Sequence, residues 1–252
     1  MSGHSKWSTI KHKKAAADAK RGQAFTRLAR EIEIAARHGG DPEMNFRLRL
    51  IMDKARAANM PKENVERAIK RGTGELKGEE LTEVLYEGYG PHGIAILVSV
   101  VTDNRNRSVS DVRRVFSKLG GTMAEPGAVS WQFARKGYVA LPAADQDPDE
   151  IFETALEADA EDVIVGEDLI EVYASVESFQ QVQEAFAARD FQVESAEITY
   201  VPNSPVALDQ KDALKIMNLV DALEELDDVQ QVFSTLDMTD ELMAAYEAAQ
   251  ES

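Results

Sequence analysis

The sequence of 252 residues contains no cysteine. This absence excludes disulfide bonds, thiolate nucleophiles and zinc sites built on cysteine. Aromatic residues make up only 7% of the chain, and no stretch approaches the roughly 18 consecutive apolar residues of a membrane-spanning helix. The first residues are polar and basic, which predicts that the chain carries no secretory signal. These features favour a cytoplasmic protein without a membrane partner.

The sequence also lacks a recognisable catalytic or metal-binding constellation. None of its four histidines has the spacing of a metal ligand. Gly72 and Gly74 lack the lysine of a phosphate-binding loop, so a linker explains them better. Asp227 and Asp228 lie in a run of charge, which predicts a solvated face. We expect no catalytic residue, no metal and no cofactor, and a protein that is not an enzyme. The enzymatic alternative is a site in a cleft between domains, which no nucleophile supports.

Charge is unevenly distributed along the chain, whose net charge is −17. Residues 1–74 contain 17 basic and 8 acidic side chains, whereas residues 75–252 contain 11 basic and 37 acidic ones. The first part therefore carries +9 and the second −26. A basic region on an acidic body is expected to meet polyanions. The abrupt change also predicts a domain boundary near residue 75.

Apolar residues recur at helical spacing in the first part of the chain, which predicts a helical domain. We expect helices at about 25–36, at 41–59 with Asp41 as the cap, and from Pro61 to about 71. Residues 10–21 are expected to be helical as well. The glycines between residues 72 and 78 predict a flexible linker.

The periodicity changes from helical to alternating after Leu81, which predicts strands. We expect strands at 82–90 and 94–102 joined by a turn, a helix capped by Ser108, and a strand at 128–133. Later come a helix capped by Asp209, a strand around 229–233 and a short helix at 239–249. The late strand lacks neighbours of its own, so we expect it to join the sheet of residues 82–133.

Between these parts, residues 135–202 show the order strand, helix, two strands, helix and strand, which is that of a ferredoxin-like unit. The strands are expected at 137–141, 162–166, 169–174 and 191–200. The predicted fold class is therefore α+β with three domains. These are a basic helical N-terminal domain at 1–78, a discontinuous α/β middle domain at 79–134 plus 203–252, and an inserted ferredoxin-like α/β domain at 135–202.

The first thirty residues are the strongest candidate for a binding site, because they hold eight basic residues and one acidic residue. Trp7 lies among the lysines, where an exposed ring can stack on a base while cations hold phosphates. The alternative is a solvated charged helix with Trp7 as an internal anchor. The turn at 103–107 adds two arginines, either as a second phosphate contact or as a turn with a helix cap. The predicted nucleic-acid-binding residues are His4, Lys6, Trp7, Lys11, His12, Lys13, Lys14, Lys20, Arg21, Arg27, Arg30, Arg105 and Arg107.

Several segments form a recognisable pattern. They are SGHSKWSTIKHKKAAADAKRG (Ser2–Gly22), FTRLAREI (Phe25–Ile32), NMPKENVERAIKRG (Asn59–Gly72), YEGYGPHG (Tyr86–Gly93), VTDNRNR (Val101–Arg107) and DALKIMNLVDALEELDDVQQV (Asp212–Val232). Together they resemble the YebC family, one member of which is a mitochondrial translational activator of cytochrome oxidase. The main departure is Phe46, where the family usually has proline. The resemblance implies a three-domain α/β protein with a helical N-terminal domain, a discontinuous middle domain and an inserted third domain. It also implies a cytoplasmic, non-enzymatic regulator of gene expression, described in the family both as DNA-binding and as acting at the ribosome.

We interpret the protein as a nucleic-acid-binding regulator that contacts phosphates through its basic domain. DNA and ribosomal RNA are both candidate ligands. Ribosomal RNA is slightly favoured, because no helix presents a clear base-reading face and structured RNA suits recognition of backbone and shape. Following the resemblance, the role would be to ease stalled synthesis on the ribosome. The alternatives are a sequence-dependent DNA-binding transcriptional regulator and a protein-interaction adaptor that uses the acidic domains. The sequence does not indicate the oligomeric state.

Overall fold

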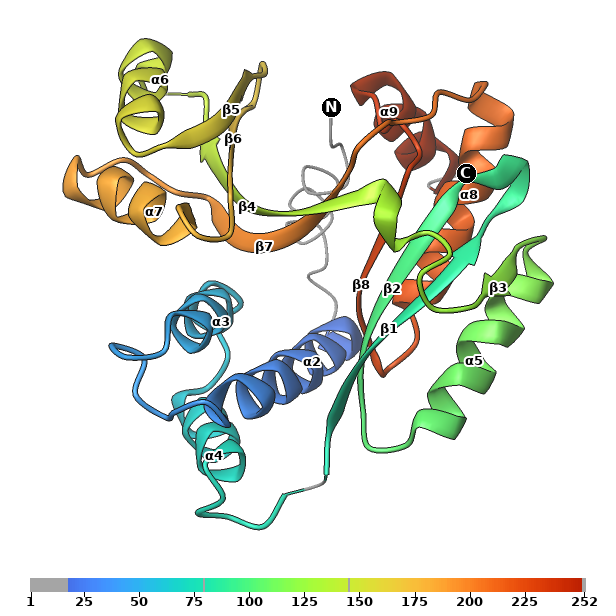
Figure 1. Cartoon of the computed structure of the whole chain (residues 1–252), viewed down its shortest axis with the longest axis horizontal. Coiled ribbons are helices and arrows are strands. Elements are labelled where there is room, and N and C mark those ends of the chain that lie inside the picture. The colour runs from blue at the N-terminus through green and yellow to red at the C-terminus, as the bar shows by residue number, and fades with distance from the viewer. Residues whose placement is uncertain (1–17, 79, 145, 251–252) are drawn as a thin grey trace. The chain divides into compact units, whose positions relative to one another are not determined.

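The computed structural model describes residues 18–78, 80–144 and 146–250 (Figure 1). The chain forms two compact units. The segments up to Phe133 and from Pro202 onward make the first unit, and Ala134–Val201 make the second. No helix within the described ranges is long and apolar enough to cross a membrane.

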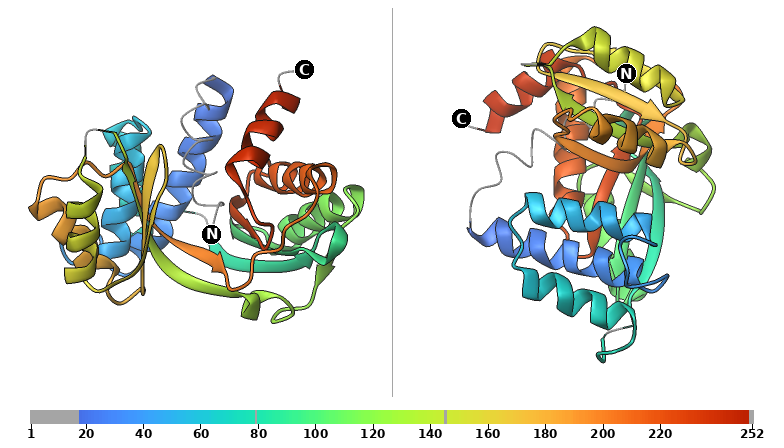
Figure 2. Two further views of the ribbon diagram at one scale, coloured as in Figure 1. Left: turned by 90° about the horizontal axis from the view of Figure 1, so that it is seen from above. Right: turned by 90° about the vertical axis from the view of Figure 1, so that its left-hand side faces the viewer.

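The first unit begins with the helices α2 (Asp18–Ala36), α3 (Phe46–Ala57) and α4 (Lys62–Gly72). The helix α2 lies between the other two (Figure 2). A buried cluster that includes Ile32, Leu48 and Ala68 joins all three. Short helices depend on such burial of their apolar faces, because isolated helices of this length are marginal in water. The predicted helical N-terminal region is thereby confirmed.

The start of α3 differs from the prediction. Asn45, and not Asp41, is the N-cap, because its side-chain oxygen accepts a hydrogen bond from the Leu48 N–H at 3.1 Å. The side-chain amide of Asn45 also donates to the Ala35 carbonyl at 2.9 Å. Both ends of this buried amide are therefore satisfied, and Phe46 becomes the first helical residue.

Gly72 also differs from its predicted place in a linker, because it is the last residue of α4. A Cβ atom at this position would lie 2.3 Å from the Glu33 carbonyl oxygen and 2.7 Å from the Ala36 Cβ. The glycine therefore allows α4 to approach the backbone of α2 closely.

A four-stranded antiparallel sheet follows, in the order β3-β1-β2-β8. Its strands are β1 (Thr82–Tyr89), β2 (Ala95–Thr102), β3 (Thr122–Ala124) and β8 (Val229–Ser234). The pairing of β8 with β2 confirms that the late strand joins this sheet. Helices α5 (Arg105–Lys118), α8 (Gln210–Glu224) and α9 (Asp240–Gln250) complete the region. Residues of β2 such as Ile96 pack with Phe116 of α5 and Leu219 of α8 in one core.

Two predicted features of this region are wrong. Residues 128–133 are not a strand, because Ser130–Gln132 form the short 3-10 helix η2 and β4 begins only at Phe133. Ser108 does not cap α5. Asn104 does, since its side chain accepts a hydrogen bond from the Arg107 N–H at 3.1 Å. Ser108 is buried in the first turn of that helix.

The second unit holds a sheet in the order β5-β6-β4-β7. Its elements are β4 (Phe133–Pro142), α6 (Pro148–Glu157), β5 (Ala160–Val165), β6 (Leu169–Ala174), α7 (Phe179–Ala188) and β7 (Ser195–Pro202). This order and sequence of elements are those of a ferredoxin-like unit. Inside it, the buried carboxylate of Glu171 accepts hydrogen bonds from Tyr138 at 3.0 Å and Tyr173 at 3.2 Å. The predicted α+β fold class is confirmed.

Candidate nucleic-acid interface

Most of the predicted binding residues fall outside the described part of the chain. Seven of them precede Asp18 and lie outside the described residues: His4, Lys6, Trp7, Lys11, His12, Lys13 and Lys14. Lys20 belongs to α2, but its side chain is not described either. The structure therefore places the side chains of the remaining five arginines, and Arg21 among them is exposed near the start of α2.

Two of these arginines point at the C-terminal end of α8. Arg27 donates from Nη2 to the Glu224 carbonyl and, at 3.3 Å, to the Leu226 carbonyl. Arg30 donates from Nη1 to the Asp227 carbonyl at 3.1 Å. The last carbonyls of a helix lack intrahelical partners and carry partial negative charge, so a cation stabilises them. These contacts hold α2 against the end of α8.

The second contact of Arg30 is the buried carboxylate of Asp228, whose side chain is only 9% exposed. Asp228 accepts hydrogen bonds from Arg30 at 2.8 Å, Arg107 at 2.9 Å, Ser108 at 2.6 Å and Thr102 at 3.0 Å. We call these five residues the Asp228 clasp. They come from α2, β2, α5 and the start of β8, so one carboxylate ties four segments together.

The clasp sets the ionisation of its carboxylate. Burial alone would raise the pKa of Asp228, but hydrogen bonds from Ser108, Arg107 and Thr102 and the charge of Arg30 hold that pKa below its usual value. The prediction that Asp228 belongs to a solvated face is therefore wrong. Thr102 of β2 is 126 positions away from Asp228 along the chain, and Arg30 of α2 is 198 positions away. Sequence patterns do not reveal contacts between such distant residues.

The remaining arginine, Arg105, differs from Arg107. Arg107 adds an ion pair with Asp103 at 2.6 Å to its contacts with Asp228. Arg105 is exposed and forms no ion pair with any residue that the structure describes. Arg27, Arg30 and Arg107 are thus engaged within the protein, which the sequence did not indicate. Their role as phosphate contacts stays a prediction.

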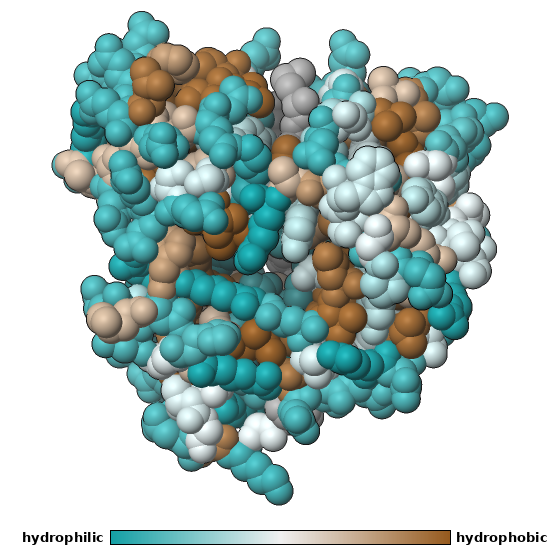
Figure 3. Space-filling view, in the orientation of Figure 1, coloured by the Kyte–Doolittle hydropathy of each residue, from teal (hydrophilic) through white to brown (hydrophobic). Residues whose placement is uncertain are grey.

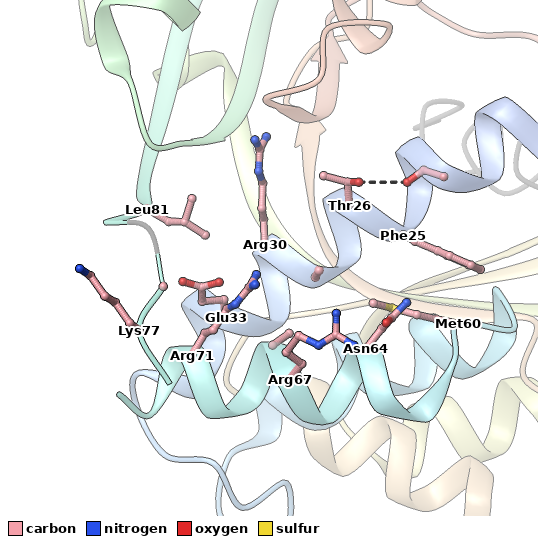
Figure 4. A pocket seen from close by; sticks show the side chains of 14 residues that line it. Phe25, Thr26, Arg30, Glu33, Met60, Asn64, Arg67, Arg71, Lys77 and Leu81 are labelled. Carbon is pink, nitrogen blue, oxygen red and sulfur yellow. Dashed lines mark hydrogen bonds between the residues drawn. The ribbon is translucent and has the colours of Figure 1, made fainter. Parts of the chain in front are cut away.

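A groove of about 810 Å³ runs along α2 and α4 (Figure 4). Four basic residues line it, and Glu33 is the one acidic residue among its lining residues. The basic residues are Arg30, Arg67, Arg71 and Lys77. We call this feature the basic groove. Arg67 and Arg71 are four positions apart, so they project from one face of α4.

Figure 4 shows Arg67 and Asn64 pointing from α4 toward α2, while Arg30 points away from α4. Arg67, Arg71 and Lys77 are exposed and form no ion pair with any described residue. The groove also contains the apolar side chains of Phe25 and Met60. Cations beside apolar surface can hold phosphates while a sugar or base covers the apolar part.

Sequence reasoning did not single out Arg67, Arg71 or Lys77. Their signal in the sequence is the four-residue spacing of Arg67 and Arg71 within the segment Asn59–Gly72. Within the described ranges, no group of three or more histidine, aspartate or glutamate residues could hold a metal ion.

Comparison with known proteins supplies the family. The model of the TACO1/YebC N-terminal domain matches residues 5–75, and the model of the TACO1/YebC second and third domains matches residues 81–236. The chain belongs to the TACO1/YebC family. The basic groove and the helices α2 to α4 therefore lie in the N-terminal domain of that family, apart from its last lining residues, Lys77, Gly78 and Leu81.

Relatives in this family extend over almost the whole chain. A protein of Geobacter sulfurreducens is 54% identical over 96% of this chain and 98% of its own length. A protein of Trichlorobacter lovleyi is 52% identical over 95% of this chain and 97% of its own length. Both carry the name probable transcriptional regulatory protein. The crystal structure of a conserved hypothetical protein from Aquifex aeolicus matches with a TM-score of 0.83 and 48% identity, covering 92% of this chain and 96% of that one.

Proposed function

We propose that this family member is a non-enzymatic regulator of gene expression that acts in the cytoplasm by binding the phosphate backbone of a nucleic acid. The basic groove is the observation that carries the proposal. Arg67, Arg71 and Lys77 are exposed there without acidic partners among the described residues, and unpaired cations in a groove attract polyanions. The basic residues of the first thirty positions extend the same charge.

Ribosomal RNA is the ligand that this surface fits best. The exposed cations of the groove are Arg67 and Arg71 on α4 and Lys77 in the segment that follows it. Two arginines are fewer than the roughly three or four side chains with which a recognition helix reads bases. Contacts of this kind recognise backbone and shape, and structured RNA is bound mainly in that way. The role that follows is a factor that helps stalled protein synthesis on the ribosome.

Two alternatives have support of their own. The names of the relatives favour a DNA-binding transcriptional regulator. The net charge of −26 on residues 75–252 favours an adaptor that binds basic proteins. The three functions predict different responses to nucleases.

Sedimentation of a cell lysate through a sucrose gradient tests the proposal. We expect the protein to move with ribosomal particles, and ribonuclease to release it while deoxyribonuclease leaves it in place. The variant Arg67→Ala/Arg71→Ala should stay near the top of the gradient, because each arginine contributes a phosphate contact. The matched control is Arg113→Ala/Arg114→Ala, which removes two exposed arginines from α5 and should sediment like the parent.

The alternatives give other results. Release by deoxyribonuclease alone would favour the DNA-binding regulator. Sedimentation that resists both nucleases, and is unchanged in Arg67→Ala/Arg71→Ala, would favour the adaptor and contradict the proposal.

A further inference from the structure

Trp131 is 71% exposed in the short helix η2, far more than is usual for a tryptophan. Its indole N–H donates to the Ala128 carbonyl at 3.0 Å, within its own loop. The ring is therefore held in place by its polar atom, and its apolar faces are left toward solvent. A ring held in this way contributes little to the core, so a structural role does not explain it.

The loop that carries Trp131 is fixed by a buried carboxylate. Glu87 of β1 is 5% exposed and accepts hydrogen bonds from the backbone N–H groups of Gly127 at 2.7 Å, Val129 at 2.6 Å and Ser130 at 2.9 Å. Burial alone would raise the pKa of Glu87, but these backbone hydrogen bonds hold it below its usual value. The carboxylate thus stays charged and holds three backbone N–H groups of the loop.

Further hydrogen bonds reach the loop from both sides. The Tyr89 hydroxyl donates to the Ala128 carbonyl at 3.1 Å. The Asn203 side chain donates to the Trp131 carbonyl at 3.0 Å, and the Asn203 N–H donates to the Gln132 carbonyl at 2.8 Å. A ring on such a support loses little conformational freedom when a ligand covers it, which favours binding.

The chemistry offered by this site is that of a flat apolar face. The indole N–H is already bonded, so the ring cannot offer it to a ligand without breaking the loop. Residues 125–133 contain one charged residue, Glu125, and the carboxylate of Glu87 is buried and bonded to the backbone of the loop. Stacking on a planar partner fits these conditions, because every nucleobase has a π-face and stacking needs no charge.

We propose that Trp131 is a stacking platform for an unpaired base of the bound nucleic acid. This inference rests on the proposed function and adds a second contact that lies outside the basic groove. Glu87 acts as a positioning residue, since it holds the loop and does not touch the base.

The fluorescence of Trp131 provides a direct test. The chain has two tryptophans, so Trp7→Phe leaves Trp131 as the only one. A short single-stranded adenine oligonucleotide is added to the full-length Trp7→Phe protein, and binding is followed separately by the anisotropy of a fluorescein label. We expect tryptophan fluorescence to be quenched in parallel with the rise in anisotropy. The same oligonucleotide with abasic positions should bind more weakly and quench little.

Affinity measurements in variants complete the test. Trp131→Ala should weaken binding by about 5-fold to about 100-fold without changing its dependence on salt, because stacking releases few counterions. Glu87→Gln should weaken binding while the ring is still present. The matched control is Leu156→Ala on α6, a residue 66% exposed, in a part of the surface where Figure 3 shows apolar side chains over α6. It should bind like the parent, and Trp131→Ala should keep the parent's urea midpoint.

Three outcomes would overturn the inference. A rise in anisotropy with unchanged tryptophan fluorescence would show that nucleic acid binds without covering Trp131, and would leave the proposed function standing. No rise in anisotropy with any RNA or DNA, in the parent protein as well as in Trp7→Phe, would remove the proposed function and this inference together. Quenching of Trp131 by a protein partner but not by the oligonucleotide would assign the ring to a protein contact instead.

Discussion

Asp228 joins four segments of the first unit through its side chain. Its carboxylate is buried and accepts hydrogen bonds from Arg30, Thr102, Arg107 and Ser108. A buried charge of this kind is tolerated because both carboxylate oxygens accept hydrogen bonds, and removing the charge deprives Arg30 and Arg107 of one anionic partner. The clasp therefore holds α2 to the sheet.

Asp228→Asn is expected to lower the free energy of unfolding by about 2 kcal/mol at neutral pH, as when a hydrogen-bonded charge is lost from a partly buried pair. Urea unfolding measures this change. The control is Asp227→Asn, because Asp227 is exposed and its side chain accepts a single hydrogen bond from the described residues, from Gln23 at 3.1 Å. It should change stability by less than about 0.5 kcal/mol.

The difference between the parent and Asp228→Asn should depend on pH. The pKa of Asp228 is lowered in the folded protein, so its contribution is complete above the unfolded value of about 3.9. That contribution is lost as the pH falls from about 3.9 through the lowered folded pKa. The difference in the free energy of unfolding between the two proteins should therefore be constant between about pH 5 and 7. It should shrink in acid. A difference that grows as the pH falls would contradict the assigned ionisation.

At the scale of single elements, the contact between α2 and α4 is set by Gly72. Its Cβ position lies 2.3 Å from the Glu33 carbonyl oxygen, which belongs to the backbone and cannot move aside alone. Gly22 in α2 is the opposite case, because no atom of the described residues lies within 4 Å of its Cβ position. The two glycines therefore respond differently to the same substitution.

Gly72→Ala should destabilise the protein by about 1–3 kcal/mol, the cost of forcing extra volume into a packed contact. Gly22→Ala should stabilise it by about 0.5–1 kcal/mol, because alanine loses less freedom than glycine in a helix. Thermal unfolding of both variants compares them directly. Equal effects would mean that α4 does not pack on α2 as closely as the structure has it.

The elements that could be predicted from the sequence are those whose apolar spacing is long and regular. The helix at α8 and the strand β2 are examples, and the pairing of β8 with β2 followed from a strand that lacked local partners. The strand expected at 128–133 failed for a physical reason. The carboxylate of Glu87 accepts hydrogen bonds from backbone N–H groups in and next to that segment, so these groups do not pair with another strand.

At the scale of the whole molecule, charge predicted a basic region but not how its cations are used. Arg27, Arg30 and Arg107 look alike in the sequence as candidates for phosphate contacts, yet they bond to α8 and Asp228. Their partners come from distant parts of the chain, which a local pattern cannot reveal. Arg67 and Arg71 became candidates only when α2 and α4 were seen to form one groove.

The division of the chain into domains is a proposal about the whole molecule. We propose that residues 1–78, 79–134 plus 203–252, and 135–202 are three domains. The contacts of Arg27 and Arg30 with the end of α8 would then be one link between the first two, beside the ion pair of Arg47 with Glu83.

The dependence of affinity on salt tests the central claim most directly. Each phosphate contact releases counterions, so the plot of log affinity against log salt concentration becomes steeper with every contact. For the purified full-length protein and a ribosomal RNA fragment, Arg67→Ala/Arg71→Ala should weaken binding and flatten this slope by roughly one unit per arginine. The control Arg113→Ala/Arg114→Ala should keep the parent's slope. An unchanged slope and affinity in Arg67→Ala/Arg71→Ala would contradict the claim that the basic groove binds nucleic acid.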